Sequence, residues 1–148
     1  MVNTRNVVLW LHIVVAMVTL GPLVLFDMVV PATVRSGNVG ALRWLERRTR
    51  VLGPMTAIVA LLGIILVLRD GDDPYSFSKG WISASLAIYL LMAVSGVAVL
   101  ERTLGRATHR VEAGEDVSSE VRRLSLFGAL NIVALLVILW LMVAKPGQ

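Results

Sequence analysis

The sequence predicts an all-α polytopic membrane protein, a bundle of four transmembrane helices. Of its 148 residues, 57% are hydrophobic and only 16% are charged, whereas about a quarter of the residues of a soluble domain are charged. The hydrophobic residues gather in four nearly uncharged segments, residues 7–30, 51–68, 81–100 and 124–144. Each can cross about 30 Å of hydrocarbon as a helix, and none alternates like a barrel strand.

The rest of the chain is too fragmented to build a soluble domain. Its longest piece, residues 101–123, cannot bury a core of its own, so we expect one transmembrane domain over residues 1–148 with short helical cytoplasmic extensions. The chain has no cysteine, which removes thiolate metal sites and iron–sulfur clusters. The net charge of +4 comes from arginines beside apolar segments, which indicates a lipid surface as partner and not nucleic acid.

The first segment, residues 7–30, is expected to be a retained span. It is too long for the apolar region of a signal peptide and no A-x-A cleavage site follows it. Gly21-Pro22 should kink this helix.

The connection over residues 31–50 predicts a short amphipathic helix lying at the lipid surface. One face carries an apolar stripe and the opposite face is basic. The stripe is Val39, Leu42 and Leu45, and the basic residues are Arg43, Arg47 and Arg50. Gly53-Pro54 is then expected to restart the chain into the second span.

The third and fourth spans are expected to continue into the cytoplasm as a helical hairpin. Apolar residues recur at helical spacing after Glu101, and Gly114 is a natural C-terminal stop. Asp116 or Ser118 can cap the helix that leads into residues 124–144.

The distribution of basic residues predicts the orientation. Ten of the 14 Lys and Arg residues lie in the first and third connections, residues 31–50 and 101–123. By the positive-inside rule these connections are cytoplasmic and both termini lie outside. The predicted location is therefore the cell inner membrane, which the chain crosses four times.

Two groups of polar residues fall inside the predicted spans, where polar groups are costly. His12, Ser85 and Tyr89 should meet in the outer third of the bilayer. A neutral imidazole suits a haem, a metal or a proton, although spacing alone favours a histidine that is simply hydrogen-bonded near the interface.

The second group, Asp27, Arg50, Thr56 and Asn131, lies near the inner boundary. Here an ion pair of Asp27 with Arg50 or Arg47 is favoured over a proton relay, and Asn131 is expected to join helices by hydrogen bonding.

Catalytic motifs are not found in the sequence. It contains no P-loop, G-x-S-x-G or H-E-x-x-H pattern. We therefore name no catalytic and no metal-ligating residue. Whether the protein is an enzyme stays open, and the sequence favours a protein without enzymatic activity.

Short motifs in the first hundred residues resemble a family. Leu11-His12-Ile13 precedes Gly21, Gly53-Pro54 precedes Gly63, and the third span opens with GWISASL at residues 80–86. The pattern resembles an uncharacterised bacterial family of four-helix integral membrane proteins, related to the copper-resistance D membrane domain and to the J-type protoporphyrinogen oxidase.

The resemblance implies haem b as a cofactor, with His12 at the position of a haem-ligating histidine. Two departures speak against oxidase activity. Ser85 stands where the oxidase branch has a lysine, and Thr19 where it has a tryptophan.

Three functions stay open at this point. The first, which we favour, is a haem, porphyrin or metal site near His12. The second is an accessory or assembly subunit of a larger membrane complex, and the third is a small transporter or proton path. A ligand pairing two copies of His12 would require a homodimer.

Overall fold

The structure is a computed structural model that describes residues 4–69, 77 and 79–146. It confirms an all-α membrane bundle, because the described residues form helices long and apolar enough for four membrane crossings and no strand. The elements are α1 (Thr4–Ser36), α2 (Val39–Arg69), α3 (Gly80–Ser95), the π-helix η1 (Gly96–Glu101), α4 (Arg102–Ala113) and α5 (Ser118–Ala144).

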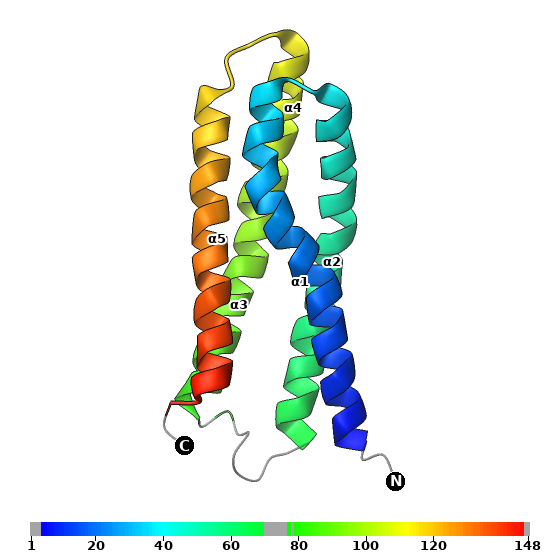
Figure 1. Cartoon of the computed structure of the whole chain (residues 1–148), viewed down its shortest axis with the longest axis vertical. Coiled ribbons are helices and arrows are strands. Elements are labelled where there is room, and N and C mark those ends of the chain that lie inside the picture. The colour runs from blue at the N-terminus through cyan, green and yellow to red at the C-terminus, as the bar shows by residue number, and fades with distance from the viewer. Residues whose placement is uncertain (1–3, 70–76, 78, 147–148) are drawn as a thin grey trace.

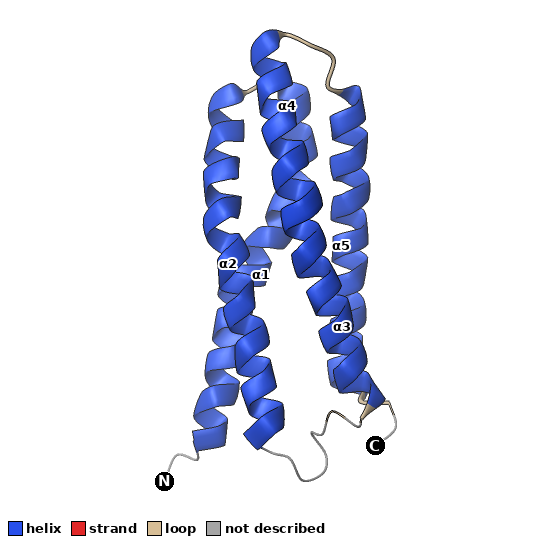
Figure 2. Cartoon of the chain, turned by 180° about the vertical axis from the view of Figure 1, so that it is seen from behind, coloured by secondary structure: helices blue, strands red, loops and turns tan. Residues whose placement is uncertain are grey.

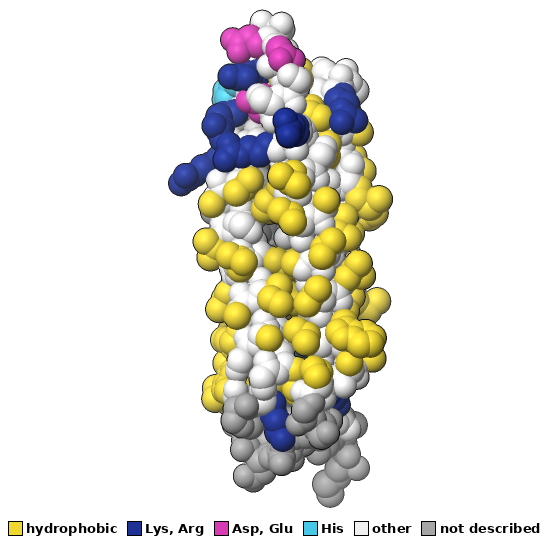
Figure 3. Space-filling view, turned by 90° about the vertical axis from the view of Figure 1, so that its left-hand side faces the viewer, with side chains coloured by type: hydrophobic (Ala, Val, Ile, Leu, Met, Phe, Trp, Pro, Cys, Tyr) yellow, Lys and Arg dark blue, Asp and Glu magenta, His cyan; other side chains and the backbone are white. Residues whose placement is uncertain are grey.

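The helices run up and down along one long axis (Figures 1 and 2). The start of α1 and the end of α5 lie at one end, and the α1–α2 and α4–α5 connections lie at the other. We call this other end the arginine-rich end, since it carries the basic residues of both connections. Its Lys and Arg side chains gather beyond a broad hydrophobic surface (Figure 3).

Both tight turns at the arginine-rich end depend on a glycine. Gly37 and Gly114 have φ values of 67° and 69°, a left-handed conformation that costs glycine little. After Gly37, Asn38 Oδ1 accepts a hydrogen bond from the Ala41 N–H at 3.0 Å and caps α2. Gly114 ends α4 as predicted.

Asp116 lies in the turn before α5, which begins at Ser118 after Val117 in the N-cap position. Its Oδ1 accepts a hydrogen bond from the Ser118 N–H at 3.1 Å, and its Oδ2 accepts one from the Ser118 hydroxyl at 2.6 Å. These bonds from Ser118 lower the pKa of Asp116 below its ordinary value. The predicted helical hairpin is thus present, with Asp116 and Ser118 acting together at its turn.

The separate surface helix expected within residues 31–50 is not formed, and this prediction was wrong. α2 runs unbroken from Val39 through Gly53-Pro54 to Arg69, so residues 39–50 extend the second span. Leu42 and Leu45 are buried among the other helices instead of facing lipid. The apolar stripe is on the predicted face, but it packs against other helices and not against lipid. The helix continues through Pro54 because a helix in a membrane bundle tolerates an internal proline.

The largest hydrophobic core lies towards the arginine-rich end. It joins α1, α2, η1, α4 and α5. Its buried members are Val30, Val34, Leu42, Leu45, Leu100, Leu104, Ala107, Val121 and Leu124. A smaller cluster of Val59, Tyr89 and Ile138 lies further along the bundle. Many large apolar side chains instead point outwards, as expected of a surface solvated by lipid.

α1 crosses the bundle obliquely and contacts a different helix at each half (Figure 1). Near its start His12 packs on Gly63 of α2, and further along Asp27 packs on Gly128 of α5. A methyl group at position 128 would lie 2.8 Å from the Asp27 carbonyl oxygen. Pro31 has no N–H to donate to this oxygen. The Asp27 carbonyl oxygen therefore lacks the usual hydrogen bond within α1, and Gly128 of α5 lies close to it.

Replacing Gly128 should loosen the α1–α5 crossing. We expect Gly128→Ala to lower the free energy of unfolding by about 1–3 kcal/mol, because the new methyl group meets rigid backbone. Thermal unfolding in detergent measures the change.

Gly105→Ala is the matched control. Nothing lies within 4 Å of a Cβ at this position of α4, so this variant should be neutral or slightly stabilised. Equal melting temperatures for the two variants would contradict a tight crossing at Gly128.

Candidate functional site

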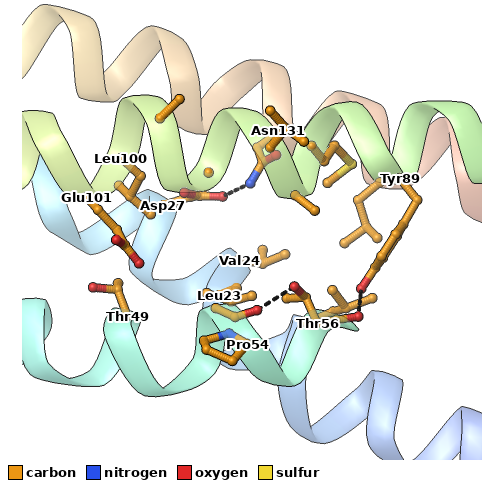
Figure 4. Close-up of a pocket in the computed structure, with 18 of the residues that line it drawn as sticks. Leu23, Val24, Asp27, Thr49, Pro54, Thr56, Tyr89, Leu100, Glu101 and Asn131 are labelled. Atoms are coloured by element: carbon orange, nitrogen blue, oxygen red, sulfur yellow. Dashed lines mark hydrogen bonds between the residues drawn. The ribbon is translucent and has the colours of Figure 1, made fainter. Parts of the chain in front are cut away.

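A cavity of about 770 Å³ lies between the helices (Figure 4). Residues from α1, α2, α3, η1, α4 and α5 line it. Much of the wall is apolar, with Leu20, Leu23, Val24, Met92 and Leu135 among the lining residues. This volume falls in the range of about 300–1,000 Å³ that is typical of small-molecule sites.

Asp27 is the buried acidic group of the cavity. Its exposed fraction is 6%, and its Oδ2 accepts a hydrogen bond from Asn131 Nδ2 at 2.7 Å. Gly128 lies one helical turn before Asn131 on α5 and allows the close crossing that brings the two side chains together. The carboxyl group is therefore held at the cavity wall by the packing of α1 on α5.

Two hydroxyl groups line the cavity from α2 and α3. The Tyr89 hydroxyl donates a hydrogen bond to the Thr56 carbonyl oxygen at 2.7 Å, and the Thr56 hydroxyl donates one to the Gly53 carbonyl oxygen. The first bond joins α3 to α2, and the second lies within α2 beside the Gly53-Pro54 pair. Both hydroxyl protons are used within the protein, so a ligand would meet these groups as acceptors.

A second carboxylate, Glu101, reaches the cavity from the end of η1. Its Oε1 would lie 3.5 Å from a Cβ placed on Gly53, and Figure 4 shows it directed towards Thr49. π-Helical turns inside α-helices are frequent at functional sites. Here the wider turn leaves both Leu100 and Glu101 lining the cavity.

The structure places the predicted inner group together. Asp27, Arg50, Thr56 and Asn131 all line this cavity. The expected ion pair of Asp27 with Arg50 or Arg47 is replaced by the hydrogen bond with Asn131. Arg50 is instead an exposed residue at the arginine-rich end.

The predicted outer group is not joined by hydrogen bonds. The Ser85 hydroxyl donates to the Trp81 carbonyl oxygen of its own helix at 2.7 Å, and the Tyr89 hydroxyl is turned to Thr56. His12 does not line the cavity. Its ring packs on Gly63, where a Cβ would lie 3.2 Å from its Cε1, and its Nδ1 is buried without a hydrogen-bond partner among the described residues.

Comparison with known proteins identifies the family. Residues 6–146 match the family described as predicted integral membrane protein (DUF2269). The chain belongs to this family. No curated protein matches it, and neither does any solved structure. The DUF2269 match extends over all four membrane-spanning segments, so the integral membrane character belongs to the whole bundle.

The family match confirms part of the resemblance found in the sequence. An uncharacterised integral membrane family is shown, whereas the relation to the copper-resistance D domain and the J-type oxidase stays a hypothesis. Within residues 4–69, 77 and 79–146 of this DUF2269 protein, no three His, Cys, Asp or Glu side chains gather as a metal site would require.

Sequence reasoning did not single out Glu101 or Thr49 as cavity residues. Glu101 directly follows the apolar segment 81–100, a position that indicates the start of the polar connection. A regular helix would place Leu100, and not Glu101, on the same face as Tyr89 and Gly96. The one available signal was a carboxylate at the end of a span that also carries Tyr89.

Proposed function

We propose that this DUF2269 protein binds a hydrophobic small molecule inside its helix bundle. The observation that carries the proposal is the cavity of about 770 Å³ with largely apolar residues around a few buried polar groups. Protein interiors are normally close-packed, and apolar clefts with a few well-placed polar groups are typical of ligand sites. Polar groups inside membrane spans are expensive and tend to mark functional sites.

The cavity has the two parts that an amphipathic ligand needs. Leu20, Met92 and Leu135 can contact an apolar body, while Asp27 and Glu101 can orient a polar group. The carboxyl group of Asp27 is already held by Asn131. Less conformational freedom is therefore lost on binding than with a mobile side chain.

Filling the cavity tests this function. Ala93 lines the cavity from α3, so Ala93→Trp should place an indole ring in the cavity, obstruct it and abolish saturable binding of N-phenyl-1-naphthylamine. This uncharged aromatic probe becomes fluorescent in apolar surroundings, and a fluorescence titration of the purified protein in detergent measures its binding.

Leu91→Trp provides the matched control, because Leu91 lies on the same helix, is 70% exposed and does not line the cavity. This variant should bind the probe as the unmodified protein does. Saturable binding that survives Ala93→Trp would place the probe elsewhere and reject the cavity as its site.

A haem, porphyrin or metal ligand at His12 is the second candidate. One observation favours it, the buried Nδ1 without a partner among the described residues, and the resemblance to a haem-ligating family supports it. The packing does not fit a porphyrin, however. The ring lies against Gly63, so a porphyrin could reach this side of the imidazole only if α1 separated from α2. The Ser85 and Tyr89 hydroxyls already donate to the carbonyl oxygens of Trp81 and Thr56.

An optical spectrum tests this candidate. If His12 ligates haem, protein purified from haem-replete cells should show a Soret band that His12→Ala removes and His109→Ala leaves. His109 is the matched histidine outside the spans. Colourless protein would eliminate haem as a resident group and leave the cavity proposal untouched.

The proposed orientation puts the arginine-rich end in the cytoplasm of a cell whose inner membrane holds the protein. Its support is the gathering of Lys and Arg side chains at that end, beyond the apolar surface (Figure 3), which agrees with the positive-inside rule. Residues 31–50 and 101–123 would then face inwards and both termini outwards.

Single cysteines can test this orientation, since the chain has none of its own. In intact spheroplasts a membrane-impermeant maleimide should label Thr4→Cys and should label Glu115→Cys only after permeabilisation. Both residues are exposed, so accessibility within the protein does not bias the comparison. The reverse labelling pattern would invert the proposed topology.

A further inference from the structure

The charges around the cavity are unevenly distributed between its interior and its edge. Asp27 is buried at 6% exposure, and Glu101 is half-buried. The two basic lining residues, Arg50 and Arg102, are both exposed. Long basic side chains near the ends of membrane helices extend their charged groups towards the interface, so the carboxylates are the charged groups best placed to meet a molecule within the cavity.

The two carboxylates keep capacity for a ligand. Asp27 uses Oδ2 in the bond with Asn131, and that bond orients the carboxyl group without neutralising its charge. Glu101 forms no hydrogen bond or ion pair with another residue within the described part of the chain. A buried carboxylate without a cationic partner is costly in an apolar medium, and a bound cation would supply that partner.

We infer that the ligand is an amphipathic organic cation, an amine or quaternary centre on an apolar body, recognised by Asp27 and Glu101. The inference rests on the proposed ligand-binding function and names its ligand class. The apolar residues contact the body of the ligand, and Tyr89, which also lines the cavity, adds an aromatic wall of the kind that accommodates organic cations.

A pair of ions with the same shape and opposite charge tests the inference. Tetraphenylphosphonium and tetraphenylborate differ in the sign of their charge, and equilibrium dialysis against the full-length protein in detergent measures both. We expect tetraphenylphosphonium to bind more tightly than tetraphenylborate. Asp27→Asn should weaken tetraphenylphosphonium binding by about tenfold, because a desolvated charge pair is lost, and should not weaken tetraphenylborate binding.

Further variants keep the test decisive. Glu101→Gln should also weaken tetraphenylphosphonium binding. If Asp27→Asn does not fold, the affinity of Glu101→Gln for this cation tests whether a cavity carboxylate recognises it. Glu112→Gln is the matched control, since Glu112 pairs with Arg43 at 2.6 Å outside the cavity and its loss should leave the affinity unchanged.

The outcomes separate the two proposals. Equal affinity for the two ions, or tighter binding of tetraphenylborate, would overturn the cation inference and point to the arginines at the edge. The cavity function would still stand if Ala93→Trp abolished probe binding. If neither ion nor N-phenyl-1-naphthylamine binds, the cavity function itself fails.

Discussion

The close crossing of α1 and α5 at Asp27 and Gly128 is the contact on which the rest of the bundle depends. Lipid chains are as apolar as leucine, so membrane helices associate through close packing and interhelical hydrogen bonds and not through the hydrophobic effect. Gly128 allows the Asp27 backbone to approach α5, and the same approach brings Asp27 within 2.7 Å of Asn131. A larger residue at position 128 would therefore affect the helix pair and the cavity wall together.

The bundle combines a packed region and a hollow one, and each has a local cause. At the arginine-rich end, α2 and α4 extend the spans and close a core around Leu42 and Leu104, both fully buried. Next to it, η1 changes the face that the third span presents, and Gly53 offers no side chain to fill the space beside Glu101. The cavity thus lies where the π-helical turn η1 is next to Gly53. The packed core at the arginine-rich end adjoins it and can support its walls.

The sequence predicted what depends on composition and local pattern, and missed what depends on neighbours. The four apolar segments and the stop at Gly114 follow from hydrophobicity and turn chemistry, and polar groups such as Asp27 and Asn131 were noticeable because lipid makes them costly. Periodicity did not show that α2 continues through Pro54, because a proline ends helices in water more often than in a membrane bundle. Nor could spacing pair Tyr89 with Thr56, since that bond depends on which helices become neighbours.

The placement of His12 and Asp27 on one helix explains why a single polar residue in a span is a weak guide to function. Both lie on α1 and both face a glycine of another helix, yet only Asp27 lines the cavity. The His12 ring is packed against Gly63 of α2 and its Nδ1 is buried, whereas a cavity of about 770 Å³ lies beside Asp27. In the sequence the histidine was the more noticeable residue, because an imidazole can bind a metal or carry a proton. A binding site also needs a cavity, however, and the cavity arises from the way several helices cross. The cavity around Asp27 and Glu101 is therefore a stronger candidate than the histidine for the function of this DUF2269 protein.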